Sequence, residues 1–277
     1  MKLSSKLGAY ALQLLFRVLP STPKELMFSG ADIIPTAIWV PTRHGNVRCL
    51  VYRKRRPIDA VGSLPVYVNI HGGAFIVRAP EQDNYICQFI ASTTDAIVVS
   101  IDYDAAPRAS YPVAEYEVYD VVEWIHRNDR QLGWNSSRLA VGGFSAGAKL
   151  AINVCQQARD SGSFMPIASI ACYPALDMTL ASTSRVSSIE KPAVAPWLIN
   201  LMYNTYFVEV AKRSDPLASP GLDNNVAAYP PVLLLVGAWI HLRLRLSDLQ
   251  KISSHPKFAS PCTVSLTAIT ALPTTSP

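Results

Sequence analysis

The chain has 277 residues, 49% of them hydrophobic, with 25 lysines and arginines against 20 aspartates and glutamates. A chain of this length can bury a large core, and α/β folds of this size often form one domain. The formal net charge of +5 comes from scattered residues, and the densest run is Arg53-Lys54-Arg55-Arg56. A solvated loop explains that run better than a nucleic-acid or membrane patch, so we expect no nucleic-acid partner.

The five cysteines form no Cys-x-x-Cys pair and lie mostly within apolar runs: Cys49, Cys87, Cys155, Cys172 and Cys262. This distribution predicts buried, reduced thiols rather than a disulfide framework, and therefore a cytoplasmic protein. The histidines and cysteines also lack the spacing of metal ligands. No metal and no cofactor are expected.

The first 20 residues contain a short apolar stretch, "LGAYALQLLF", preceded by lysines. Its spacing predicts an amphipathic helix, with apolar residues at Leu7, Tyr10, Ala11, Leu14, Leu15 and Val18. A secretory signal is the alternative, but Gln13 and Arg17 interrupt the stretch and no small-residue cleavage site follows. The stretch is too short to cross a bilayer, so no stable membrane insertion is expected.

Strands and helices alternate along the rest of the chain. The segment 36–54 alternates on both sides of His44-Gly45-Asn46, which predicts two strands and a turn. Continuous apolar runs predict strands that are covered on both faces at 64–70, 96–103, 138–143, 167–173 and 230–237. Helical patterns occupy 84–92, 113–127 and 146–159. We therefore expect an α/β fold with a mostly parallel sheet and helices on both faces, in a single domain over residues 1–277.

One serine stands in Gly143-Phe144-Ser145-Ala146-Gly147, which has the form Gly-x-Ser-x-Gly. A strand is predicted to end at Gly143 and a helix to begin after Ser145, so the serine occupies a tight turn with an unfavourable backbone conformation. Such a turn lifts the hydroxyl at the carboxyl edge of the sheet, where open α/β sheets bind ligands. The alternative is that Ser145 is an ordinary N-cap of the helix.

A second motif, "HGGAF" at residues 71–75, directly follows the predicted strand 64–70. Two glycines after a strand let the backbone direct N–H groups toward one point, as an acyl-transfer site requires for its oxyanion. A flexible turn is the alternative. The occurrence of this motif upstream of a strand, Gly-x-Ser-x-Gly and helix favours a catalytic site.

Taken together, these motifs resemble the hormone-sensitive-lipase-like carboxylesterases, a family of α/β hydrolases. In "HGGAF", Ala74 replaces a third glycine. The segment 100–125 resembles the family's Asp-Tyr-Arg-Leu-Ala-Pro segment and the helix after it, with Asp104 where arginine is usual. In "GGFSAG", Phe144 stands where aspartate is common. "DPLASP" (215–220) and "PPVLLLVG" (230–237) resemble the approach to the strand that bears the acid, so the resemblance runs from about Ile38 to Gly237.

The resemblance implies roles for particular residues. Ser145 would be the nucleophile, and the backbone amides of Gly72, Gly73 and Ala146 would form the oxyanion hole. His71 would support the geometry of the loop and would not be the catalytic base.

It also implies a cap over the pocket, formed by residues of about 1–30 and 180–213. Aromatic residues of the second segment would line an apolar acyl pocket or, alternatively, only pack the cap: Trp197, Tyr203, Tyr206 and Phe207.

The acid and the base of a catalytic triad are missing from their expected places. In this fold the order is serine, acid, histidine, and the acid should follow "VLLLVG" as Gly-x-x-Asp. The chain instead reads "GAWIHLRLRLSDLQK", in which the first carboxylate is Asp248, and no histidine follows His255. The last strand and helix of the fold are not recognisable either, which makes residues 238–277 an atypical tail.

Three explanations remain open. His241 or His255 could form an unusual triad with Asp248 or Asp223, or the chain could be a pseudoenzyme that binds a ligand without turnover. Alternatively, the reading frame shifts near Ala238. Trp is encoded by TGG and every isoleucine codon begins with AT, so reading from the third base of the Trp239 codon gives GAT, which encodes aspartate.

The sequence thus predicts a carboxylic-ester hydrolase that acts on small esters of modest acyl length through an acyl-enzyme at Ser145. The alternative is a small-molecule-binding receptor on the same fold. The motifs do not fix the natural ester or the oligomeric state.

Overall fold

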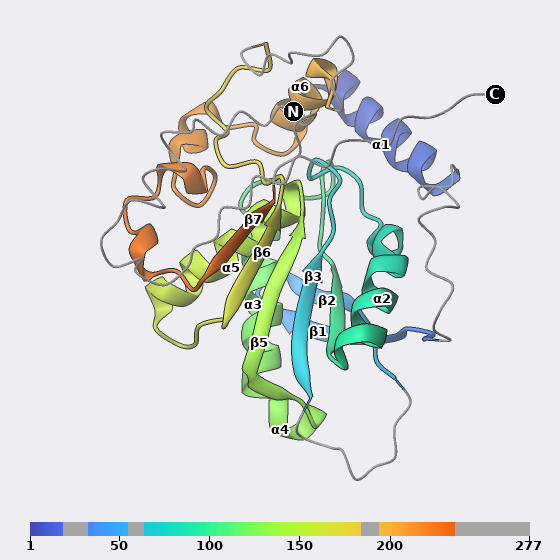
Figure 1. The fold of residues 1–277 in the computed structure, drawn as a ribbon. Coiled ribbons are helices and arrows are strands. Elements are labelled where there is room, and N and C mark those ends of the chain that lie inside the picture. Colours follow the sequence, from blue (N-terminus) through green and yellow to red (C-terminus); the bar gives the residue numbers. More distant parts are fainter. Residues whose placement is uncertain (19–32, 55–63, 184–193, 236–277) are drawn as a thin grey trace, which may run out of the picture.

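A computed structural model describes residues 1–18, 33–54, 64–183 and 194–235, and the structural statements below concern these residues (Figure 1). Their centre is one seven-stranded sheet with the strand order β1-β2-β4-β3-β5-β6-β7. The strands are β1 (Thr36–Thr42), β2 (Gly45–Tyr52), β3 (Pro65–Ile70), β4 (Ile97–Asp102), β5 (Asn135–Phe144), β6 (Ala168–Cys172) and β7 (Val232–Leu235). Each strand expected from the sequence is present.

The sheet is antiparallel at one edge and parallel elsewhere. β1 and β2 form the expected hairpin, β2 runs antiparallel to β4, and β4, β3, β5, β6 and β7 are mutually parallel. In the central register, Val68 lies opposite Val99 on one side and Val141 on the other. The mostly parallel α/β sheet expected from the sequence is confirmed.

Helices cover both faces of this sheet, as predicted. They are α1 (Leu3–Val18), α2 (Asn84–Thr94), α3 (Val113–Arg127), α4 (Asp129–Leu132), α5 (Ala146–Ser161) and α6 (Pro196–Thr205), with short 3₁₀ helices η3 (Pro80–Asp83), η4 (Val210–Ser214), η5 (Pro220–Leu222) and η6 (Val226–Ala228). α3 and α5 contact each other on one face, and α2 packs on β2 and β4 from the opposite face (Figure 1).

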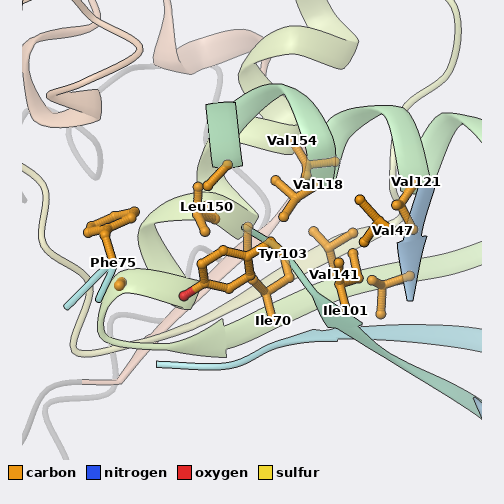
Figure 2. Packing of buried hydrophobic residues seen from close by; sticks show 14 of the residues in the cluster. Val47, Ile70, Phe75, Ile101, Tyr103, Val118, Val121, Val141, Leu150 and Val154 are labelled. Atoms are coloured by element: carbon orange, nitrogen blue, oxygen red, sulfur yellow. The ribbon is translucent and has the colours of Figure 1, made fainter. Parts of the chain in front are cut away.

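The core follows the alternation of side chains along the strands. Val99 belongs to the large apolar cluster under α3 and α5, whereas its neighbour Val98 belongs to a smaller cluster with Cys87 and Ala91 of α2. Figure 2 shows the large cluster, in which side chains of α3 and α5 pack over the central strands: Val118, Val121, Leu150 and Val154 above Ile70, Ile101 and Val141. This packing fixes α5, and with it the serine at its start.

Three further expectations concern the chain as a whole. Cys49, Cys87, Cys155 and Cys172 are buried and unbridged, while Cys262 lies outside the described residues. Within the described ranges, no helix has the length and apolar content needed to cross a bilayer. Nor do three or more His, Cys, Asp or Glu side chains in that part of the chain come together as metal ligands. The cellular compartment stays a prediction.

Candidate active site

Ser145 occupies the junction between β5 and α5 in a strained backbone conformation. Its φ is +53° and its ψ is −113°, a region that residues other than glycine rarely adopt. The Ser145 amide donates a hydrogen bond to the carbonyl oxygen of Cys172 on β6 at 2.9 Å. Ser145 stands at the N-cap position of α5, but its side chain makes no capping hydrogen bond to the helix. The hydroxyl is therefore left available at the carboxyl edge of the sheet.

Gly147 allows the start of α5 to approach the end of β3 very closely. A Cβ atom at Gly147 would lie 1.9 Å from the carbonyl oxygen of Ile70 and 2.5 Å from that of His71. Both are backbone atoms that cannot move aside, so only glycine fits here. The second glycine of Gly-x-Ser-x-Gly thus allows the serine turn to pack against β3. This strand leads into the loop of residues 71–79, called the diglycine loop below.

The diglycine loop passes directly beside Ser145. A Cβ atom at Gly72 would lie 3.1 Å from the carbonyl oxygen of Phe144 and 3.7 Å from the Cβ atom of Ser145. Gly73 follows with a φ of +132°, in the region that favours glycine. The two motifs that the sequence placed about 70 residues apart are therefore in contact through their backbones.

Amide groups around this contact have no partner inside the described part of the protein. The amides of Gly72 and Gly73 make no hydrogen bond to another described residue. Ala146 is the first residue of α5, and the first amides of a helix lack intrahelical acceptors. An anionic oxygen between the serine and the loop would meet donors of this kind, which stabilise a tetrahedral intermediate.

His71 directly follows β3, at the start of the diglycine loop. Its ring is fully buried and stacks on Tyr103 with the ring centres 4.4 Å apart, and the Tyr103 hydroxyl donates to the His71 carbonyl at 3.0 Å. Burial lowers the pKa of His71 to about 4, against the opposing effect of its hydrogen bond with the Gly72 carbonyl. The neutral ring donates from Nδ1 to that carbonyl at 2.7 Å, and Nε2 has no partner among the described residues. Such a ring is suited to fixing the loop and not to accepting a proton at neutral pH.

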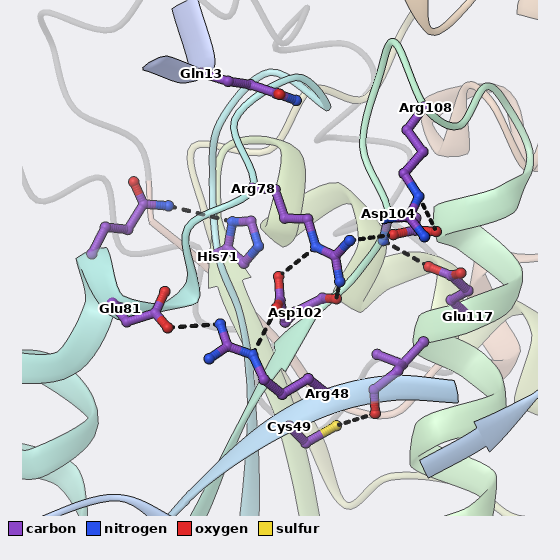
Figure 3. Close-up of polar contacts among 12 residues, drawn as sticks. Gln13, Arg48, Cys49, His71, Arg78, Glu81, Asp102, Asp104, Arg108 and Glu117 are labelled. Atoms are coloured by element: carbon purple, nitrogen blue, oxygen red, sulfur yellow. Dashed lines mark hydrogen bonds and ion pairs between the residues drawn. The ribbon is translucent and has the colours of Figure 1, made fainter. Parts of the chain in front are cut away.

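An ionic network holds the far end of the loop (Figure 3). Arg78 donates from Nε to Asp102 at 2.8 Å and from Nη1 to Asp104 at 2.6 Å. The Asp104 amide donates to the Glu117 carboxylate at 2.7 Å, and Arg48 donates to Asp102 at 2.9 Å. Asp104, noted in the sequence only as a departure from the family pattern, is thus the partner of Arg78. No sequence spacing indicated this network, because its members come from separate elements.

A fully buried ion pair lies one helical turn beyond the serine. Lys149 of α5 pairs with Glu115 of α3, and both side chains are inaccessible to solvent. Glu115 also accepts a hydrogen bond from the Tyr206 hydroxyl at 2.6 Å. The Lys149 ammonium lies 5.4 Å from the ring centres of both Phe75 and Phe207. Burial lowers the pKa of Lys149, and the neighbouring Glu115 opposes that shift.

Of the four aromatic residues expected in a cap, three are buried and one is exposed. Tyr206 stacks on Phe75 of the diglycine loop at 4.7 Å, and Phe207 meets the same ring edge-on at 5.2 Å. Both are buried, so they pack against Phe75 of the loop. Tyr203 donates to the Leu180 carbonyl at 2.7 Å, and Trp197 is exposed.

The candidate acid and base residues His241, Asp248 and His255 lie outside the described residues. The remaining candidate, Asp223, is placed away from the serine. It accepts hydrogen bonds from Arg159 at 2.7 Å, Tyr229 at 2.6 Å and Gln156 at 3.0 Å. Gln156 stands 11 residues beyond Ser145, which is about 16 Å along an α-helix. Asp223 thus binds side chains from the C-terminal half of α5, away from Ser145.

Residues 67–251 match the family model for the alpha/beta hydrolase fold, which is about two thirds of the chain. The chain belongs to the α/β-hydrolase family. The matched region includes the diglycine loop, the serine turn and β7, and it extends past Ala238. The expected fold class is therefore confirmed.

The relatives of the chain include esterases and a lipase. The chain is 31% identical over 180 residues to the esterase LipI of Mycobacterium tuberculosis, covering 65% of this chain and 56% of that protein. It is 30% identical over 152 residues to bovine hormone-sensitive lipase, covering 54% of this chain and 20% of the lipase. The expected resemblance to the hormone-sensitive-lipase-like esterases is thereby confirmed. The chain spans about half of the length of the first curated esterases it matches.

Solved structures show the same architecture. A hyperthermophilic esterase from the archaeon Pyrobaculum calidifontis superimposes with a TM-score of 0.75 at 26% identity, over 92% of this chain and 79% of that one. The α/β-hydrolase architecture therefore extends over most of the chain.

Proposed function

We propose that the chain is a serine carboxylic-ester hydrolase with Ser145 as its nucleophile and the amides of Gly72, Gly73 and Ala146 as its oxyanion hole. One observation carries the proposal: the strained Ser145 lies beside the Gly72 backbone, where a Cβ atom added to Gly72 would lie 3.7 Å from the Cβ atom of Ser145. Strain of this kind persists where the surrounding structure enforces it, and it is frequent at active sites.

In the proposed reaction, the Ser145 hydroxyl oxygen attacks the ester carbonyl while its proton passes to a base. The resulting oxyanion accepts hydrogen bonds from the three amides, each of which is worth about 10²- to 10³-fold in rate in comparable sites. Return of the proton to the departing alcohol leaves an acyl-enzyme. Water then attacks the acyl group through the same steps and releases the carboxylic acid. The acid and the base of the catalytic triad would come from the segment that contains His241, Asp248 and His255.

The proposed substrates are small carboxylic esters of modest acyl length. Named esterases and a carboxylesterase among the relatives support the ester class. We infer that a cap from about 1–30 and 180–213 completes a single domain and limits the acyl length. The contact between α1 and α6, close to the carboxyl ends of the parallel strands, supports such a cap (Figure 1).

Labelling and turnover test the proposal together. The purified protein is treated with a fluorophosphonate probe and assayed with p-nitrophenyl acetate and butyrate. We expect labelling and hydrolysis that Ser145→Ala abolishes. The matched control is Ser137→Ala, since Ser137 is an exposed serine on β5, the strand that leads to Ser145. If Ser145→Ala still took up the probe, another residue would be the nucleophile and the proposal would be wrong.

A second candidate is a small-molecule-binding protein that does not turn over. It is favoured by the sequence after β7, where Ile240 stands at the acid position of Gly-x-x-Asp, counted from Gly237. Saturable ligand binding without probe labelling would establish this alternative. A burst of nitrophenol followed by no turnover would instead mean that Ser145 is acylated but lacks a working base.

A further inference from the structure

Helix α1 turns its larger apolar face away from the protein. Four of its residues are between 60% and 72% exposed, namely Leu3, Leu7, Leu14 and Val18. With the exposed Tyr10, they recur at spacings of three and four and therefore share one helix face. Ala9 and Leu12 are the residues of α1 that are buried against the rest of the described protein. A continuous apolar face of this kind marks an interaction surface.

The charges of α1 indicate what this face contacts. Residues 1–18 include Lys2, Lys6 and Arg17 and no aspartate or glutamate. Lys2 and Lys6 are exposed and precede Leu3 and Leu7 directly, at the border of the apolar face. Two copies joined through this face would bring like charges together, which disfavours a dimer. An apolar face bordered by lysines is suited to a lipid–water interface that carries negative charge.

The inner side of α1 is connected to the proposed active site. The Gln13 side-chain amide donates to the carbonyl oxygen of Ile76 at 2.8 Å and to that of Ala106 at 2.9 Å. Ile76 belongs to the loop that begins with Gly72, and Figure 3 shows Gln13 above that loop and the network around Arg78. A surface bound by α1 would therefore lie close to the site where an ester enters.

We propose that α1 is an interfacial docking helix that binds anionic lipid surfaces through Leu3, Leu7, Tyr10, Leu14 and Val18, with Lys2 and Lys6 toward the headgroups. The helix lies in the plane of the interface and does not span the bilayer. This inference goes beyond the proposed ester hydrolysis. Its test does not depend on Ser145, because binding is measured without turnover.

The full chain is sedimented with mixed phosphatidylglycerol–phosphatidylcholine vesicles and with pure phosphatidylcholine vesicles. We expect binding to the anionic vesicles that weakens at high salt. Leu7→Ser combined with Leu14→Ser should lower the partition coefficient by at least about tenfold. Lys2→Gln combined with Lys6→Gln should lower it about 30-fold on the anionic vesicles alone. The control Ile167→Ser changes an exposed isoleucine just before β6, at the opposite end of the sheet, and should leave binding unchanged.

Three results would overturn the proposal. The unaltered chain could fail to bind anionic vesicles, or Ile167→Ser could reduce binding as much as the α1 variants do. Light scattering could also show a dimer that Leu7→Ser with Leu14→Ser dissociates without changing vesicle binding, in which case a second copy covers the face. Because both leucines point to solvent, the variants should keep the thermal midpoint of the parent, and this is measured first.

Discussion

The buried ion pair between Lys149 and Glu115 provides the sharpest test of the packing around the serine. Lys149→Met keeps most of the apolar stem of the side chain and removes the charge together with the hydrogen bond that Nζ donates to Glu115. Glu115 would then have lost its cationic partner, with no access to solvent and with the Tyr206 hydroxyl as its side-chain partner. Removing one member of a buried pair typically costs about 3 to 5 kcal/mol, because it leaves an uncompensated charge in a medium of low dielectric constant.

Removing both charges should lower the free energy of unfolding far less than removing Lys149 alone. In the double variant Lys149→Met with Glu115→Leu, no buried charge remains, and the main loss is the acceptor of the Tyr206 hydroxyl. An unsatisfied hydroxyl costs about 1 to 3 kcal/mol. The double variant should therefore be more stable than Lys149→Met alone, with a coupling energy between the two positions of at least about 3 kcal/mol.

Urea unfolding followed by tryptophan fluorescence measures these free energies of unfolding. The exposed pair of Lys212 and Glu209 supplies the control, since Lys212→Met should change the free energy of unfolding by less than about 1 kcal/mol. If Lys149→Met cost no more than this control and the double variant were additive, the pair would be solvated and the reasoning refuted.

Two other changes test the geometry of the site. Gly147→Ala should abolish probe labelling and destabilise the fold, because its Cβ would lie 1.9 Å from the Ile70 carbonyl oxygen; the helical control Gly8→Ala, whose nearest contact is an ordinary 3.5 Å, should keep full labelling. His71, with a pKa lowered by burial to about 4, should contribute stability that is complete above about pH 6.5 and is lost as the pH falls through 4. The free energy of unfolding of the parent relative to His71→Asn should therefore drop by about 3 kcal/mol between pH 7 and pH 4 in urea titrations. The comparison with His71→Asn is needed because Glu117 also titrates in this range. Burial raises the pKa of Glu117 to about 7, so its contribution to stability falls as the pH rises.

The fold could be read from the sequence because its signals are local. Strands covered on both faces require uninterrupted apolar runs, such as 96–103, and amphipathic helices require apolar residues at spacings of three and four. Both patterns are visible in a short window of sequence. The direction in which α1 faces was not visible, because the spacing defines an apolar face but does not say whether the protein covers it.

The site was predictable to the extent that it rests on backbone geometry. Glycines at 143 and 147 stand where chain segments approach too closely for a side chain, and such glycines form recognisable motifs. The pair of Lys149 and Glu115, in contrast, joins two helices through side chains that resemble ordinary surface charges in the sequence. Only the three-dimensional packing of α3 against α5 shows that they are buried together.

The proposed chemistry needs two parts, the serine with its oxyanion donors and a proton acceptor, and these have different structural origins. The serine turn and its amides are fixed by contacts of β3, β6 and α5, such as the Ser145 amide on Cys172 and the approach of Gly147 to Ile70. A proton acceptor for the serine must come from a different part of the chain. In a triad enzyme, loss of the base leaves a residual rate of roughly 10³-fold over water, supplied by the oxyanion hole and by binding. Fluorophosphonate labelling needs a base to take the serine proton, as the first step of turnover does, whereas sustained turnover needs the base again to activate water. Loss of both would therefore point to a missing base, and labelling without sustained turnover would point to a failure of deacylation.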